Sequence, residues 1–330
     1  DNVGNLNQPA TQSFDVQFQP SLWIDTPREA VEGKQKTMVF TVRLTGRVAK
    51  PVTVQYVTVR GSAIAGKDYK AVKGTLTFRP NQSLTQTIKV PILNDRMYAG
   101  TRTFQVKLSP GKSKGSVMVP IAVGTAKGTI LDNDPVPRLS IRNVSVKEGN
   151  RGTTKATFVV TLSAPSRLAT TVQYALADGT ATLADDDFRA AAGVLNFKPG
   201  QTKKSITVLV IGDRTYEAKE TFLVNLSNPT NAALARAVGM GTIVNDDPLP
   251  KLSLRNATAN EGDGPSVFTV PLSAASGLPV TVLCATANKT SSGEDYSAAS
   301  GAKIATKTAA ATFGDNDASS GKAHAAALVA

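Results

Sequence analysis

Short segments in which apolar and polar residues alternate recur along the whole chain. Val52, Val54 and Tyr56 fall on one side of an extended segment, and the same alternation returns at 169–174 and 279–284. A period of two residues is typical of a β-strand with one buried face. Outside the alanine-rich C-terminal end, no segment sustains the apolar spacing of an amphipathic helix. The pattern therefore predicts an all-β chain.

Turn residues punctuate these segments at short intervals. Segments 74–78 and 193–197 each run into a turn that contains proline, and a further predicted strand follows each turn. About seven short strands in each unit of about 115 residues, with turns every 8 to 12 residues, are typical of a sandwich of two antiparallel sheets. The predicted fold class is all-β, with tandem antiparallel β-sandwiches of immunoglobulin-like architecture.

Three motifs recur in the same order, which indicates an internal repeat. The motifs are Glu-Gly at 32–33, 148–149 and 261–262; an acidic turn before an aromatic residue at 66–69, 185–188 and 293–296; and an Asp/Asn-rich closing segment at 132–134, 245–247 and 315–317. The first two copies are each about 115 residues long, whereas the third is shorter by about 43 residues.

This spacing divides the chain into five parts. They are an N-terminal extension at 1–20, repeat 1 at 21–134, repeat 2 at 135–247, a shortened repeat 3 at 248–317, and an alanine-rich tail at 318–330. Prolines at 135, 137, 248 and 250 leave short, stiff connections between the repeats.

The amino-acid composition excludes several classes of protein. The chain has one cysteine, which excludes a disulfide scaffold and a cysteine-based zinc site. It has one histidine, which excludes most mechanisms of acid–base catalysis that depend on histidine. It has no apolar run of about 18 residues, so no transmembrane segment is expected. The net charge is +12. The sequence contains no recognisable set of nucleophile, general base and oxyanion-hole donors, so we expect that the protein is not an enzyme.

The motifs together carry a family resemblance. Glu-Gly, the acidic turn, the strand that ends in Asn94-Asp95, the Glu217-x-x-Glu220-Thr-Phe222 segment and the closing Asp-Asn-Asp-Pro resemble the Calx-beta domain. This family is named for sodium/calcium exchangers and is abundant in bacterial surface proteins. The resemblance runs from about residue 22 to residue 317. It implies seven-stranded sandwiches in which acidic loops at one end hold Ca²⁺.

The resemblance implies a ligand set in repeat 2. Carried over residue by residue, it consists of Glu148, Asp187, Asp213, Glu217, Glu220, Asp246 and Asp247. Ca²⁺ takes six to eight oxygen ligands, and the loops of a sandwich cluster at its two ends, where such ligands can converge. Arg214 departs from the pattern, because calcium-binding members often have a second Asp there. The alternative is that these acids form Asx turns and pair with Lys or Arg.

Repeat 1 departs further from the family pattern. Ala99 and Arg102 occupy the positions of Glu217 and Glu220, and Arg96 is close by. A guanidinium cannot ligate a cation, so we expect repeat 1 to bind Ca²⁺ weakly or not at all. Its remaining acids are Glu32, Asp68, Asp95, Asp132 and Asp134. Repeat 3 keeps Glu261, Asp295, Asp315 and Asp317 but lacks the Glu-x-x-Glu segment.

These features favour a non-enzymatic structural or adhesive protein outside the cell or on its surface, with Ca²⁺ stabilising repeat 2. The start at Asp1 fits a mature product after signal removal or a fragment. An alternative is a filament subunit, in which Phe14–Phe18 of one chain completes the shortened repeat 3 of a neighbouring copy. A weaker alternative is binding of anionic polymers through the basic surface, without specific nucleic-acid recognition.

Overall fold

A computed structural model describes most of the chain. The described residues are 19–111, 115–258 and 268–285, and the strand segments 296–297, 300–306, 310–314, 323–324 and 326–328. Side chains are described up to residue 283. The chain divides into two compact units, Asp1–Pro135 and Val136–Ala330. The proposed donor segment Phe14–Phe18 lies outside the described residues.

The first unit contains repeat 1, built from nine strands in two sheets. One sheet has the order β6-β3-β1-β8 and the other has the order β2-β9-β7-β4-β5. The strands are β1 (Leu22–Asp25), β2 (Ala30–Val31), β3 (Thr37–Leu44), β4 (Val52–Arg60), β5 (Lys73–Phe78), β6 (Thr85–Pro91), β7 (Arg102–Pro110), β8 (Ile121–Val123) and β9 (Thr125–Leu131).

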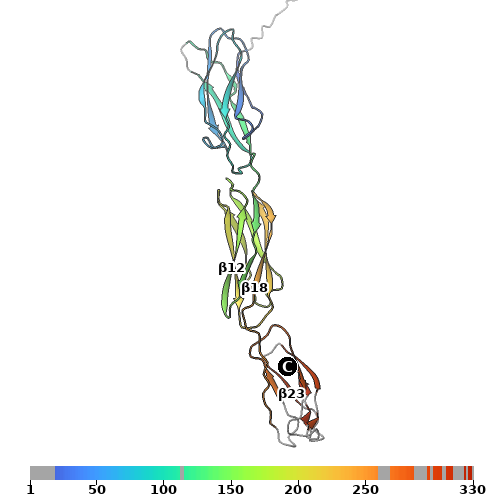
Figure 1. Ribbon diagram of the computed structural model, residues 1–330. Coiled ribbons are helices and arrows are strands. Elements are labelled where there is room, and N and C mark those ends of the chain that lie inside the picture. Colours follow the sequence, from blue (N-terminus) through green and yellow to red (C-terminus); the bar gives the residue numbers. More distant parts are fainter. Residues whose placement is uncertain are drawn as a thin grey trace, which may run out of the picture. The chain divides into compact units, whose positions relative to one another are not determined.

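Repeat 2, in the second unit, has the same topology. Its sheets have the orders β15-β12-β10-β17 and β11-β18-β16-β13-β14, and Figure 1 labels one strand from each, β12 and β18. The strands are β10 (Arg138–Ile141), β11 (Val144–Lys147), β12 (Gly152–Leu162), β13 (Thr170–Asp178), β14 (Ala192–Phe197), β15 (Lys203–Gly212), β16 (Glu220–Thr230), β17 (Ala233–Arg236) and β18 (Val238–Val244).

The rest of the second unit is also made of strands. The described strands are β19 (Phe268–Pro271), β20 (Val280–Ala285), β21 (Tyr296–Ser297), β22 (Ser300–Thr306), β23 (Ala310–Gly314), β24 (Ala323–His324) and β25 (Ala326–Leu328). Strand β23 pairs with β19 and also with β25, so a segment beyond residue 317 joins the same sheet.

Each complete repeat encloses its own hydrophobic core between its two sheets. Strand β3 shows the cause most clearly, because Met38, Phe40, Val42 and Leu44 alternate with exposed or half-exposed residues and are at most 2% exposed. Burying one such side chain contributes about 1.5–3 kcal/mol. The two cores are separate clusters, which allows each repeat to be considered as a folding unit.

Three aromatic rings form the same stack in both cores. In repeat 1, Tyr69 stacks on Phe104 at 4.3 Å between ring centroids, and Phe40 meets Phe104 edge-on at 5.8 Å. In repeat 2, Phe188 stacks on Phe222 at 4.8 Å between ring centroids, and Phe158 meets Phe222 edge-on at 5.8 Å. The stack anchors the loop between β4 and β5, or between β13 and β14, because Tyr69 and Phe188 belong to these loops.

A glycine makes room for the central ring of each stack. A Cβ atom on Gly128 would lie 2.6 Å from the Phe104 ring, and one on Gly241 would collide with the Phe222 ring. Both glycines lie within strands, where glycine is otherwise unfavourable, so close approach of the ring explains them.

The all-β fold class predicted from the sequence is confirmed, as tandem β-sandwiches. Within the described part of the chain, no helix has the length and apolar character required to cross a bilayer.

Candidate metal centre

The seven predicted ligands of repeat 2 lie on segments that meet at one end of the sandwich. Glu148 follows β11, and Asp246 and Asp247 follow β18, which pairs in parallel with β11 up to Lys147 and Val244. The segment from β15 to the start of β16 carries Asp213, Glu217 and Glu220. Asp187 lies in the loop between β13 and β14. The topology therefore brings four separate segments to the same edge.

Local features of the sequence fix two of these segments. Gly149 has a φ of 84° and Gly33 has a φ of 73°, so in both complete repeats the residue after the glutamate of the Glu-Gly motif turns the chain away from its strand. Asp187 precedes the buried ring of Phe188, and its Oδ2 accepts a hydrogen bond from the Thr182 amide at 2.7 Å. Core packing thus positions the Asp187 carboxylate.

Three carboxylates form the centre of the cluster. Single oxygen atoms of Asp187, Glu217 and Glu220 all lie within 4.8 Å of one another. Ionised carboxylates this close repel one another, so the group favours a bound proton or a cation.

The electrostatics of the cluster disfavour negative charge in the absence of a cation. Burial, then the charges of Glu217, Asp213, Asp247 and Asp246, raise the pKa of Glu148 to about 7. Burial and the neighbouring acids Asp187 and Glu217 raise the pKa of Glu220 to about 7 as well. Burial is the first cause of the raised pKa values of Asp187, Glu217 and Asp247.

Two buried oxygen atoms of this cluster have no hydrogen-bond partner. They are Oε1 of Glu148, a residue only 5% exposed, and Oδ2 of Asp247, a residue 7% exposed. An unsatisfied buried acceptor costs about 1–3 kcal/mol, and more when charged. A cation bound beside either oxygen would satisfy that acceptor. The donor set is made entirely of oxygen, which fits a hard cation such as Ca²⁺.

The two remaining predicted ligands of repeat 2 lie at the solvent-exposed edge of the carboxylate cluster. Asp213 and Asp246 are exposed, and each accepts a backbone hydrogen bond, from Thr215 at 2.6 Å and from Gly149 at 3.0 Å. Their charges still raise the pKa of Glu148. Arg214 is exposed, and its charge opposes the upward shift of the Asp247 pKa. The structure thus gathers all seven acids, with Asp213 and Asp246 on the solvent side.

One acid near the cluster was missed by sequence reasoning. The charge of Asp185 contributes to the raised pKa values of Asp187, Glu217 and Glu220. Its Oδ2 accepts a hydrogen bond from the Thr182 hydroxyl at 2.8 Å. The run of three aspartates at 185–187 was the available signal.

Repeat 1 has an arginine at the corresponding place. The Nη2 atom of Arg102 lies 2.8 Å from Oε1 of Glu32, and its Nη1 atom pairs with Oδ1 of Asp68. Burial alone would lower the pKa of the Arg102 guanidinium, but the charges of Asp68 and Glu32 outweigh burial and raise it. Salt links between acids and an arginine, which the sequence analysis gave as an alternative for these loops, are present around Arg102.

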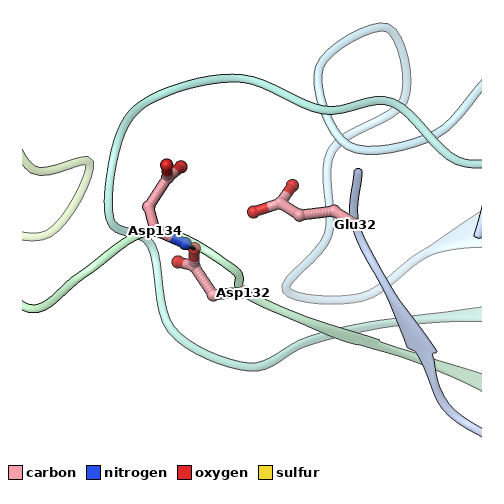
Figure 2. Close-up of side chains that lie close together, drawn as sticks. All are labelled: Glu32, Asp132 and Asp134. Carbon is pink, nitrogen blue, oxygen red and sulfur yellow. Dashed lines mark hydrogen bonds between the residues drawn. The ribbon is translucent and has the colours of Figure 1, made fainter. Parts of the chain in front are cut away.

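Other acids of repeat 1 lie on the far side of Glu32. Figure 2 shows Glu32, Asp132 and Asp134 directed toward one another, and single oxygens of the three lie within 4.8 Å of each other. Burial raises the pKa of Glu32 to about 7, although Arg102 opposes the shift. Asp132 accepts hydrogen bonds from the amides of Ala99, Gly100 and Asp134. Arg96 is exposed.

The remaining candidates cannot be placed. Glu261, Asp295, Asp315 and Asp317 of repeat 3 lie outside the described residues.

Comparison with known proteins supports the assignment of both complete repeats. The family model of the Calx-beta domain matches residues 15–134 and 136–248. Sodium/calcium exchanger 2 of Rattus norvegicus is 27% identical over 227 residues, which cover 64% of this chain and 24% of that protein. Sodium/calcium exchanger 3 of Mus musculus is 28% identical over 244 residues, covering 68% of this chain and 25% of that protein.

Solved structures of similar proteins were also found. The crystal structure of CBD12 from CALX1.2 has a TM-score of 0.31 and 18% identity, and the match covers 68% of this chain and 99% of that one. The apo-form Calx CBD1 domain has a TM-score of 0.31 and 23% identity, covering 36% of this chain and all of that one. The chain spans about a quarter of the length of the exchangers it matches. On the family match over both repeats, the chain belongs to the Calx-beta domain family.

Proposed function

We propose that the chain is a non-enzymatic structural or adhesive β-repeat protein that acts outside the cell, and that Ca²⁺ stabilises its second repeat. The observation that carries the proposal is the cluster of carboxylates in repeat 2, with unpartnered buried oxygens on Glu148 and Asp247. Ionised acids this close repel one another, and a divalent cation removes that repulsion.

The family supports the calcium part of the proposal. The relatives named sodium/calcium exchangers match 64% and 68% of this chain, although the matched region is about a quarter of their own length. The chemistry of the donor set points the same way, because Ca²⁺ prefers several carboxylates drawn from separate loops.

The absence of catalysis is proposed on chemical grounds. The acids of repeat 2 surround one another rather than flank a nucleophile, and the chain has a single cysteine and a single histidine. Carboxylates drawn from separate loops are the donor set that Ca²⁺ prefers.

The calcium part is tested by heating the full chain with chelator or with millimolar Ca²⁺. Ligand that binds only the folded state raises its melting temperature, so the repeat 2 transition should move upward with Ca²⁺. Asp187→Asn combined with Glu217→Gln should abolish that shift. The matched control is Glu29→Gln, at an exposed site of repeat 1, which should leave the shift intact. An unchanged repeat 2 transition in the wild type would refute calcium binding.

The extracellular part is tested by the affinity. Calcium modules that work outside cells have dissociation constants on the order of 10⁻⁴–10⁻³ M, whereas sensors inside cells bind at about 10⁻⁷–10⁻⁵ M. Isothermal titration calorimetry of the full chain should give a value in the weaker range. Submicromolar binding would contradict the proposed location.

We propose surface or matrix components, or another copy of the chain, as partners. The filament arrangement is tested by deleting residues 1–20 and looking for assemblies by electron microscopy. Filaments that persist without these residues would exclude strand donation by the N-terminal segment. Binding to anionic polymers predicts adhesion that weakens steeply as salt is raised.

A further inference from the structure

The two complete repeats place different residues at one equivalent position. Arg102 opens β7 and pairs with Ile130 of β9, whereas Glu220 opens β16 and pairs with Ile243 of β18. Strand order is the same in both repeats, so these two residues occupy the same corner of the sandwich. Repeat 1 therefore has a cation where repeat 2 has a carboxylate.

The groups facing this corner are also equivalent. Asp68 precedes the stacked ring of Tyr69, just as Asp187 precedes that of Phe188. Glu32 follows β2, and its amide donates to the Leu131 carbonyl at 3.0 Å, whereas the Glu148 amide donates to the Val244 carbonyl at 3.3 Å. Repeat 1 thus aims two acids at Arg102, and in repeat 2 the equivalent of one of them, Asp187, has an oxygen within 4.8 Å of Glu220.

The Arg102 guanidinium joins both acids of repeat 1. It contacts Glu32 and Asp68 through separate nitrogen atoms, and the exposed fractions of the three side chains are 5%, 1% and 1%. Charge-assisted hydrogen bonds of this kind are about twice as strong as neutral ones. Breaking such a buried pair by removing one partner is strongly destabilising, because it leaves an uncompensated charge.

The neighbouring loop is closed by its own backbone. Ala99 stands at the position of Glu217, and its amide donates to Oδ2 of Asp132, as does the Gly100 amide at 2.7 Å. In repeat 2, the equivalent segment instead brings the Glu217 carboxylate toward Asp187 and Glu220. Repeat 1 therefore joins Glu32 and Asp68 through an internal cation and holds Asp132 through amide donors, while Oε2 of Glu32 and Oδ2 of Asp134 have no hydrogen-bond partner.

We propose that Arg102 is a built-in counter-ion that keeps the acidic loops of repeat 1 closed without Ca²⁺, and that Arg102→Glu converts repeat 1 into a calcium-dependent domain. The inference concerns repeat 1 alone and does not depend on calcium binding by repeat 2. It makes the side chain at position 102 a determinant of whether repeat 1 responds to the metal.

The chain has a probe that reports on repeat 1 separately. Trp23, in β1, is the only tryptophan of the chain, and 43% of it is exposed. Its fluorescence during heating follows the unfolding of repeat 1 in the full-length protein. In the wild type, we expect the same midpoint with chelator and with millimolar Ca²⁺.

Substitutions at Arg102 give the decisive comparison. Arg102→Glu should lower the Trp23 midpoint in chelator by on the order of 10 °C. Millimolar Ca²⁺ should restore most of that loss, and titration calorimetry should detect at least one additional Ca²⁺ per chain. Arg102→Gln, which has neither charge, should be destabilised with a smaller calcium response. Arg43→Gln breaks a 2.6 Å salt bridge to Asp25 that is largely exposed, and serves as the matched control without a calcium effect.

Hydrogen exchange of the wild type gives a test that needs no variant. Protection of the Ala99 and Gly100 amides should be unchanged by Ca²⁺, whereas residues 213–220 of repeat 2 report independently on the proposed calcium site. A gain in protection at Ala99 and Gly100, or a wild-type Trp23 midpoint that rises with Ca²⁺, would overturn the inference. So would Arg102→Glu that folds but gains no calcium response.

Discussion

Replacing one carboxylate of repeat 2 with its neutral isostere should stabilise this repeat when metal is absent. Glu220 lies within 4.8 Å of Asp187 and Glu217, and burial together with these acids raises its pKa to about 7. The folded state therefore binds a proton at Glu220 more tightly than the unfolded chain does. Stability from this group is complete below the unfolded pKa and is lost as pH rises through the folded pKa. At pH about 8 the ionised group opposes folding, and Glu220→Gln removes that cost.

The size of the effect follows from the pKa. Each pKa unit corresponds to about 1.4 kcal/mol, so a rise from 4.5 to about 7 sets an upper limit near 3 kcal/mol at high pH. Glu220 is partly exposed, and solvent screening reduces this to about 1–2 kcal/mol. For a domain of this size, that gain raises the melting temperature by about 4–8 °C.

The assay is calorimetry of the full chain in chelator at high and low pH, with Trp23 fluorescence marking the separate transition of repeat 1. Glu220→Gln should raise the repeat 2 transition near pH 8, and the gain should disappear by about pH 5. With Ca²⁺ present, the same variant should be less stable than the wild type, because a ligand is lost. A variant that melts below the wild type in chelator at high pH would show that the carboxylates do not repel.

Three further outcomes are expected. In chelator, the melting temperature of repeat 2 in the wild type should rise as pH falls from about 8 to 5, because Glu148 and Glu220, each with a pKa of about 7, become protonated. Over the same pH range the Ca²⁺ affinity measured by titration calorimetry should fall, because protons compete with Ca²⁺ for the carboxylates. Gly241→Val should destabilise repeat 2 by at least about 1–3 kcal/mol in chemical denaturation, because its side chain would overlap the Phe222 ring; no loss would contradict the packing. Phe188→Ala should lower the free energy of unfolding by about 3–5 kcal/mol and also weaken Ca²⁺ binding, since the ring anchors Asp187. An unchanged Ca²⁺ affinity in the folded variant would show that the ring does not position Asp187.

Much of the fold could be predicted from the sequence, because the pattern that specifies it is local. Alternation at 52–56 gives strand β4, and the Glu-Gly motif marks the turn after β2 and β11. The same periodicity gives no information on which strands pair across the sandwich. The parallel contacts of β1 with β8 and of β10 with β17 link the start of each repeat to its last third, and they depend on the whole fold.

The candidate site was less fully predictable. The resemblance to the Calx-beta pattern identified the seven acids of repeat 2, which lie within three residues of a strand end or, for Asp187, next to the buried Phe188 ring. Which of them are buried depended on loop geometry, so Asp213 and Asp246 could not be distinguished from Glu148. Arg102 shows a similar limit. Its residue type indicates that it opposes a metal, but only the structure shows that it joins Glu32 and Asp68.

The parallel pairing of β11 with β18 has a mechanical consequence. The first strand of this sheet along the chain and the last strand of repeat 2 run side by side over four residue pairs, from Val144 with Gly241 to Lys147 with Val244. A force that pulls the two ends of the repeat apart would load all these hydrogen bonds together in shear, rather than break them one by one. In repeat 1, the equivalent strands β2 and β9 share only two residue pairs. Glu148 and Asp247 lie just beyond the longer pairing, so an ion held between them would fasten the two strands where tension enters repeat 2.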